Sequence, residues 1–350
     1  MLRAHWRART SAERLNHEAL ILYVDFNNED SFWKRYYIPL LYCFQHCGYS
    51  ILLRYRWRFF SKLVEANDVD LFTLRNLKFT ISHPPSNAAL FLTDRANSPS
   101  AYGNRPVKSV IVRAGYNVSL DHPAQVSLPY LMHPEVYRYG YHHVKSKRKE
   151  DDADRDILAF FAGNIDPAEY DRDSLRSEHG VATRFELVEA VRKNISETQT
   201  VIVETWDEKA RLKADLRDKV VIVNSRKSGL DKEEYFDLLA RSRFFLAMPG
   251  IWYPWAHNLA EALLMSCIPI IQFPRYISAE LVDHENCIVF NQPADLAPAI
   301  RRCAELPIEE VQRMTRKARN FYESAFSPEA VVASIAQRPA ENIELLIKYG

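Results

Sequence analysis

The chain has 350 residues, of which 47% are hydrophobic and 26% are charged, and its formal net charge is +1. This length predicts about two domains, and the composition is typical of a soluble globular protein. The charge balance gives no reason to expect a nucleic-acid partner. Neither a G-x-G-x-x-G motif nor a P-loop motif occurs, which argues against the common dinucleotide and nucleoside-triphosphate sites.

The first half of the chain begins an α/β unit. Residues 19–26 predict a strand, and residues 31–48 have the apolar spacing of a helix that stops at Gly48. Residues 49–53 predict a second strand, so strand, helix and strand follow one another as in a doubly wound fold. Further short strands are expected at residues 78–82, 89–93 and 109–113.

Residues 141–156 form a mixed-charge run without hydrophobic periodicity, and they predict a solvated linker. We therefore expect an N-terminal domain over 1–140, a linker over 141–156, a C-terminal domain over 157–325 and a tail or helix over 326–350.

The second half alternates buried strands with helices, which predicts a parallel sheet with helices on both faces. The expected strands are 157–162, 200–204, 220–224, 244–248, 268–273 and 287–290. The expected helices are 183–193, 232–241, 257–266, 294–305 and 308–324.

Residues 241–271 are the most informative part of the chain. An apolar strand stops at Pro249-Gly250, an aromatic loop follows, and a helix begins near His257 and Asn258. A polar loop and a helix N-terminus at the carboxyl end of a buried strand favour an anionic ligand.

Individual side chains of this loop and helix suit such a ligand. Gly250 permits close backbone approach, and His257 and Asn258 can donate to phosphate oxygens. Glu261 can accept hydrogen bonds from hydroxyl groups, and Trp252, Tyr253 or Trp255 can stack on a ring. The alternative is that His257 is a capping residue and Glu261 an ordinary first-turn glutamate.

This part of the chain contains the pattern S-x-F-x-L-x-x-x-G followed by E-A-x-x-x-x-C-I-P-I-I. The pattern resembles the donor-binding segment of GT-B glycosyltransferases, especially the exostosin-like and related inverting families. The resemblance covers residues 235–300, including the turn at 283–290, and extends more moderately over 157–192. It implies an α/β fold of two Rossmann-like domains facing a cleft, with an acceptor-side first domain. It also implies that Glu261 holds ribose or sugar hydroxyls of the donor.

Other polar residues at strand ends fit the same donor. Gly163 and Asn164 follow a buried strand, in a loop that touches donor phosphates or the acceptor in the resembled families. Arg184 begins the next helix, where a guanidinium can bind a diphosphate with two parallel hydrogen bonds. Arg226 and Lys227 follow a third strand and would lie near the nucleotide. The alternatives are a plain turn for Gly163 and Asn164, and solvated side chains for the three cations.

An inverting transferase needs a base that deprotonates the acceptor hydroxyl. Asp25 and Asp94 end predicted strands of the first domain and are the candidates, although an aspartate in this position is often only a turn or helix cap. His122 and His133 are weaker candidates. Arginines alternate with aromatic residues over 54–60, where they could hold an anionic acceptor, meet a membrane surface or simply be solvated.

No metal site and no cofactor is predicted, because H-E-x-x-H and C-x-x-C motifs do not occur and the D-x-D triplets lie in polar contexts. The predicted activity is transfer of a sugar from a nucleotide-diphosphate sugar to an acceptor hydroxyl, metal-independent and inverting. The acceptor would be a glycan, a glycolipid or a protein. The alternatives are a sugar-nucleotide epimerase and a non-catalytic nucleotide-sugar-binding protein.

The cysteines and apolar segments bear on location. Five cysteines with scattered spacing predict free buried thiols and a reducing compartment. No apolar stretch approaches the ~20 residues of a membrane-spanning helix, and no apolar segment follows the basic N-terminus as in a signal peptide. These features predict a cytoplasmic protein. One alternative adds peripheral contact with a membrane, and the other places the protein in the Golgi lumen after loss of an anchor.

Overall fold

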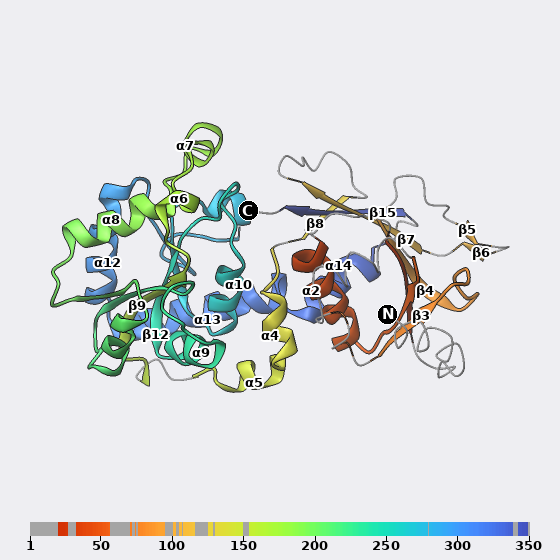
Figure 1. Cartoon of the computed structure of the whole chain (residues 1–350), viewed down its shortest axis with the longest axis horizontal. Coiled ribbons are helices and arrows are strands. Elements are labelled where there is room, and N and C mark those ends of the chain that lie inside the picture. The colour runs from red at the N-terminus through yellow and green to blue at the C-terminus, as the bar shows by residue number, and fades with distance from the viewer. Residues whose placement is uncertain are drawn as a thin grey trace. The chain divides into compact units, whose positions relative to one another are not determined.

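The chain divides into two units, each with its own parallel sheet (Figure 1). Unit 1 comprises Met1–Arg138 and Ala325–Lys348, and unit 2 comprises Tyr139–Ser324 with Tyr349–Gly350. The computed structural model describes residues 20–26, 33–56, 71, 74, 76–94, 101–102, 105–106, 108–115, 125–128, 130–149, 154–278, 280–338 and 342–348.

Unit 1 contains a seven-stranded parallel sheet in the order β3-β2-β1-β4-β7-β15-β8. Its strands are β1 (Ile21–Asp25), β2 (Ser50–Arg54), β3 (Leu77–Thr80), β4 (Ala88–Thr93), β7 (Lys108–Gly115), β8 (Gln125–Leu128) and β15 (Asn342–Lys348). All five residues of β1 are buried, because strands on both sides and packed side chains on both faces cover it. Such continuous burial explains why β1 is an apolar run rather than an alternating one.

Three described helices and one short hairpin complete unit 1. The helices are α2 (Trp33–His46), α4 (Pro134–Arg138) and α14 (Pro328–Ala336), and the hairpin joins β5 (Ala101–Tyr102) to β6 (Arg105–Pro106). The chain leaves α2 through Gly48, whose φ of 85° lies in the left-handed region. The predicted stop at this glycine is therefore confirmed.

The C-terminal segment differs from the tail or helix that we expected. Residues 326–350 contain both α14 and β15, and β15 lies between β7 and β8 with parallel pairing to each. Buried Ile343, Leu345 and Leu346 anchor the strand. A short apolar run at a chain end does not distinguish a strand from a helix, which is why the sequence left this choice open.

Unit 2 contains a six-stranded parallel sheet in the order β10-β11-β9-β12-β13-β14. Its strands are β9 (Ile157–Gly163), β10 (Thr200–Val203), β11 (Val220–Asn224), β12 (Ser242–Ala247), β13 (Ile268–Ile271) and β14 (Ile288–Val289). Each predicted strand of this half is present, within a few residues of the expected ends. Fully buried phenylalanines on β9 and β12 fill the centre of the unit.

Helices precede, connect and follow these strands along the chain. They are α5 (Tyr141–Ser146), α6 (Pro167–Tyr170), α7 (Asp173–His179), α8 (Arg184–Asn194), η3 (Asp207–Lys213), α9 (Lys232–Ala240), α10 (His257–Leu264), α11 (Pro274–Ile277), α12 (Pro293–Glu305) and α13 (Ile308–Ala325). Thr183 with Glu186 and Asp231 with Glu234 form capping boxes that fix the starts of α8 and α9.

Residues 141–156 do not form the purely solvated linker that we expected. Part of the segment folds as α5, and Arg148 donates to the carbonyl of Leu264 and to Glu323. Arg155 is 3% exposed and donates to the carbonyls of Ser242 and Met265. Both arginines donate to backbone carbonyls at the ends of helices or strands. The number of charges in the segment does not predict these contacts.

All five cysteines are free, and four of them are buried, as predicted. Burial raises the pKa of Cys287 and of Cys303 to about 12, so both stay protonated near neutral pH. Among the described residues, no helix combines the length and the hydropathy needed to cross a membrane.

Candidate functional site

The polar residues predicted for the second half gather at one edge of the unit 2 sheet. β9, β11 and β12 run parallel, so their carboxyl ends meet at the same edge. The loops that leave this edge begin at Gly163, Asn224 and Met248. Ligands of open α/β sheets bind at such edges.

Arg184 joins two of these loops. It is only 4% exposed, and its Nε and one terminal nitrogen donate to the carbonyl of Pro249 at 3.2 and 2.7 Å. The other terminal nitrogen donates to the carbonyl of Asn164 at 2.7 Å. The guanidinium also lies over Tyr170, 3.9 Å from the ring centroid. Burial lowers the pKa of Arg184, because carbonyl dipoles compensate its charge less well than water does.

Gly163 makes room for this arginine. A Cβ at position 163 would lie 2.7 Å from Cζ of Phe161 and 3.2 Å from a terminal nitrogen of Arg184. The neighbouring Asn164 stabilises the loop, since its amide donates to Glu169 and its oxygen accepts from the backbone of Asp166. Gly163 and Asn164 thus shape the loop that holds Arg184.

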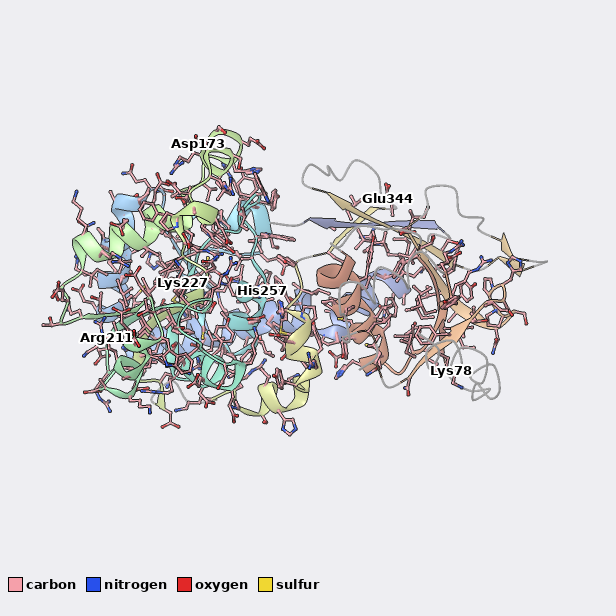
Figure 2. The ribbon with its side chains drawn as sticks, in the orientation of Figure 1. Lys78, Asp173, Arg211, Lys227, His257 and Glu344 are labelled. Carbon is pink, nitrogen blue, oxygen red and sulfur yellow. The ribbon has the colours of Figure 1, made fainter. Side chains whose placement is uncertain are left out.

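Arg226 and Lys227 lie on the loop after β11 and pair with acids of the loop after β9. Arg226 binds Glu169, and Lys227 binds Asp166 at 2.8 Å (Lys227 in Figure 2). The pair with Lys227 lowers the pKa of Asp166. More than half of each cation's side chain is exposed, and such surface pairs contribute little to stability. Both cations can therefore exchange these acids for an incoming anion at little cost.

His257 and Glu261 form a pair on the first turns of α10. Nδ1 of His257 lies 2.9 Å from Oε1 of Glu261, whose side chain is completely buried, whereas 28% of the histidine is exposed (His257 in Figure 2). Burial and the nearby Glu261 raise the pKa of Tyr235 well above its usual value. In this arrangement the histidine is partly accessible from solvent, and the glutamate is not.

Three buried polar atoms of this edge have no hydrogen-bond partner within the described part of the chain. They are Oδ1 of Asn224, Nε1 of Trp255 and Oδ1 of Asn258. The three residues are 3–4% exposed. Leaving one such atom unsatisfied costs about 1–3 kcal/mol, and native folds rarely tolerate a group of them without a reason. Gly250 is buried in the same loop as Trp255.

An aromatic group lies beside the loop, and the sequence reasoning named only Trp252 and Tyr253 among its members. His179 packs edge-on against Tyr253 and Tyr276, and the guanidinium of Arg172 lies over the ring of Trp252. These residues come from three separate segments, and no spacing in the sequence connects them. Trp252 is 45% exposed, so an aromatic face is open at this edge, whereas Trp255 is buried.

The candidate bases of unit 1 lie at the carboxyl ends of adjacent strands. Asp25 ends β1, and Asp94 follows β4, which pairs with β1 in parallel. Asp25 is 1% exposed and accepts from Arg56 at 2.5 and 2.7 Å and from Arg54 at 3.2 Å. The bond to Asp25 raises the pKa of Arg56. Two of the arginines over 54–60 therefore compensate a buried carboxylate.

The remaining candidates add little. His122 lies outside the described residues. Nδ1 of His133 lies 3.5 Å from Oε2 of Glu135 on α4. Across the described ranges, no group of three or more histidine, cysteine, aspartate or glutamate side chains is arranged to hold a metal ion.

A family model described as the Exostosin GT47 domain matches residues 89–301, which is more than half of the chain. The chain belongs to the exostosin GT47 family. It is therefore a glycosyltransferase, and its two parallel α/β sheets agree with the GT-B class that the sequence resemblance implied. The exostosin match covers the strands from β4 to β8 in unit 1 and every strand of unit 2.

Several solved structures are similar to this exostosin chain at low identity. A sucrose-phosphate synthase from Thermosynechococcus elongatus is 11% identical, with a TM-score of 0.45 over 90% of this chain and 97% of its own. A glycosyltransferase from Rickettsia africae is 11% identical, with a TM-score of 0.46 over 93% and 100%. The Anabaena protein HepE, solved with UDP, is 12% identical, with a TM-score of 0.40 over 91% and 98%. Among curated proteins, none matches the chain significantly.

Proposed function

We propose that this glycosyltransferase takes its sugar from a nucleotide-diphosphate sugar, and that the diphosphate binds at the carboxyl edge of the unit 2 sheet. The observation that supports this most strongly is the group of unsatisfied buried atoms on Asn224, Trp255 and Asn258. A bound ligand that offers both donors and acceptors would satisfy them and recover their desolvation cost. A nucleotide sugar offers both, through its phosphate oxygens and its hydroxyl and base groups.

The charge at this edge suits a diphosphate. Arg184 is a buried cation that, among the described residues, is hydrogen-bonded to backbone carbonyls rather than to a carboxylate. The N-terminus of α10 adds a partial positive charge beside His257. Arg226 and Lys227 supply exposed cations at the rim. Together they would stabilise the leaving diphosphate, so we infer metal-independent transfer.

We assign separate roles to the residues of α10 and its loop. Nε2 of His257 would contact a phosphate oxygen, while the buried Glu261 fixes the orientation of the ring through Nδ1. Direct contact between Glu261 and donor hydroxyls would require this pair to open. Trp255 would donate through Nε1, and Gly250 would let the loop backbone approach the ligand.

We further propose that transfer inverts the anomeric carbon and that Asp94 is the base. As the acceptor oxygen bonds to the anomeric carbon, its proton passes to Asp94, and the bond to phosphate breaks with its electrons leaving on the diphosphate. Asp25 is less suited to this role, because its carboxylate oxygens already accept hydrogen bonds from two guanidinium groups. Its contribution would be to position Arg54 and Arg56.

The donor site can be tested without knowing the acceptor. We would measure thermal unfolding of the full chain with UDP, GDP, ADP and CDP, and with their common sugar derivatives. A nucleoside diphosphate at a hundred times its Kd stabilises a protein by about 2.7 kcal/mol, which raises the melting temperature by several degrees. If no nucleoside diphosphate stabilises the chain at millimolar concentration, the proposed site is wrong.

The reaction itself separates transfer from the alternative activities. Incubation of the stabilising donor with candidate glycan acceptors, followed by NMR of the product, gives both the linkage and its anomeric configuration. Donor conversion without any acceptor would instead indicate an epimerase, and retention of configuration would overturn the inverting mechanism.

A further inference from the structure

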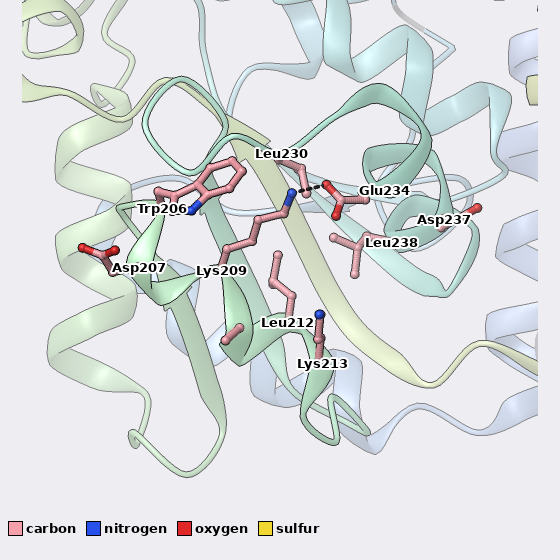
Figure 3. A pocket seen from close by; sticks show the side chains of 10 residues that line it. Trp206, Asp207, Lys209, Leu212, Lys213, Leu230, Glu234, Asp237 and Leu238 are labelled. Carbon is pink, nitrogen blue, oxygen red and sulfur yellow. Dashed lines mark ion pairs between the residues drawn. The ribbon is translucent and has the colours of Figure 1, made fainter.

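A groove of about 620 Å³ lies between η3 and α9 of unit 2 (Figure 3). Its volume falls in the range of small-molecule sites. Its lining contains none of the residues that we propose for the donor, although Leu230 at its border lies only a few residues beyond Lys227. The groove is therefore a separate feature that the donor site does not explain.

An exposed tryptophan lines this groove and is held in place. Trp206 is 64% exposed, yet it packs so closely on Gly229 that a Cβ at that glycine would clash with the indole. Nζ of Lys209 lies 5.2 Å from the ring centroid and donates to the carbonyl of Gly229 at 2.9 Å. The same ammonium pairs with Glu234 at 2.6 Å, which is the dashed contact in Figure 3. A fixed and exposed indole is an unusual use of a large apolar side chain, and it suits a planar or apolar ligand face.

The charges of the groove decide between ligand classes. Its lining contains three carboxylates, on Asp207, Glu234 and Asp237, and two ammonium groups, on Lys209 and Lys213. Lys147 lies outside the lining and pairs with Asp237 at 2.8 Å. The groove thus has no surplus positive charge for a phosphate or a uronate. Carboxylates that accept hydroxyl hydrogens beside an aromatic platform and the apolar Leu212 suit a neutral polyol instead.

We propose that this groove binds a neutral sugar residue of a glycan chain, with one C–H face on Trp206 and its hydroxyls on the acidic rim. A sugar bound here would keep a long acceptor attached between transfers, because tethering raises the effective concentration of its other end. The role in retaining an acceptor rests on the proposed glycosyl transfer. The binding of a neutral sugar in the groove does not depend on that proposal.

Saturation-transfer NMR on the full chain tests the proposal. The probes are the neutral hexamers cellohexaose, maltohexaose and xylohexaose, with hexagalacturonate as the anionic comparison. We expect at least one neutral hexamer to bind, Trp206→Ala to weaken it about tenfold, and Trp206→Phe to retain most of the affinity.

Two controls separate this site from the donor site. Trp252→Ala removes the other exposed tryptophan of unit 2 and is expected to leave hexamer binding unchanged. Trp206→Ala is expected to leave the thermal stabilisation by nucleoside diphosphates unchanged. The proposal is overturned if no neutral hexamer shows Trp206-dependent binding, or if hexagalacturonate or UDP occupies the groove in preference to the neutral sugars.

Discussion

The carboxyl edges of the two sheets differ in whether their buried polar groups have hydrogen-bond partners among the described residues. In unit 1, the buried carboxylate of Asp25 receives hydrogen bonds from Arg54 and Arg56, and Thr93 donates to its carbonyl. In unit 2, Trp255 and Asn258 bury polar atoms that no described residue satisfies. Among the described residues, the buried carboxylate at the first edge is satisfied within the protein, whereas these buried atoms at the second edge are not.

This difference separates stability from binding. A satisfied ion pair belongs to the fold, and breaking it removes stability whether or not a ligand is present. An unsatisfied donor or acceptor costs stability in the free protein and recovers that cost only when a ligand binds. Substitutions at the two edges should therefore have opposite effects on the unliganded protein.

The largest effect on stability is expected at Asp25. Asp25→Ala leaves two arginines without their buried carboxylate and should destabilise unit 1 by about 3 kcal/mol. Urea unfolding followed by circular dichroism measures this loss. A change below about 1 kcal/mol would show that the unit 1 edge is not held together by this ion pair.

Asp94 should affect catalysis instead. Asp94→Asn is expected to lower kcat at least about a hundredfold while donor binding and unfolding stay nearly unchanged, because the amide cannot accept the acceptor's proton. Steady-state kinetics with the identified donor and acceptor measure the effect. Full turnover by this variant would remove Asp94 from the mechanism and leave unit 1 without an assigned base.

Substitution of an unsatisfied buried atom of unit 2 should affect stability in the opposite way to substitution of Asp25. Trp255→Phe removes an unsatisfied buried N–H and should leave the unliganded protein equally stable, or up to about 1 kcal/mol more stable. The same variant should bind nucleoside diphosphate about tenfold more weakly. Strong destabilisation with unchanged nucleotide binding would mean that Trp255 is only a core residue.

A smaller effect is expected at the opposite end of the unit 2 strands. Asp156 precedes β9 and forms two hydrogen bonds with Arg241, which lower the pKa of Asp156. A lowered folded-state pKa stabilises the protein above the unfolded pKa of about 3.9, and this stability is lost as the pH falls through the folded value. The stability difference between wild type and Asp156→Asn should therefore shrink between pH 6 and pH 3. A difference that stays constant over that range would exclude this linkage.

The smallest effect is expected from metal removal. If Arg184, His257 and the N-terminus of α10 stabilise the leaving diphosphate, EDTA should change turnover by less than about twofold. Loss of activity with EDTA and its recovery with Mg²⁺ or Mn²⁺ would replace this part of the mechanism.

The sequence predicted every strand of the unit 2 sheet and five of the seven strands of the unit 1 sheet, but neither β8 nor β15. Buried runs such as 157–163 and 220–224 are apolar throughout, so their type could be read locally. The position of β15 between β7 and β8 depends on contacts with residues more than two hundred positions away, and no local pattern contains that information. Likewise, α7 lies in a polar stretch without a clear apolar period.

The loops that form the candidate site could be predicted from the sequence, but the burial and the hydrogen-bond partners of their side chains could not. The strand ends placed Gly163, Asn164 and Arg184 at one edge, as parallel strands require. The burial of Arg184 depends on the carbonyl of Pro249, which is 65 residues away in the chain. The closure of Glu261 onto His257 follows the i, i+4 spacing of a helix, and that spacing was visible in the sequence without being recognised.

Isothermal titration calorimetry of the full chain with UDP, GDP and their parent nucleosides tests the central claim most directly, with wild type compared to the double variant Trp255→Phe, Asn258→Leu. The account predicts that one diphosphate binds wild type at least about tenfold more tightly than its nucleoside, and that the double variant unfolds no earlier yet gives no binding heat. Equal binding of nucleoside and diphosphate, or unchanged diphosphate binding by the double variant, would contradict it.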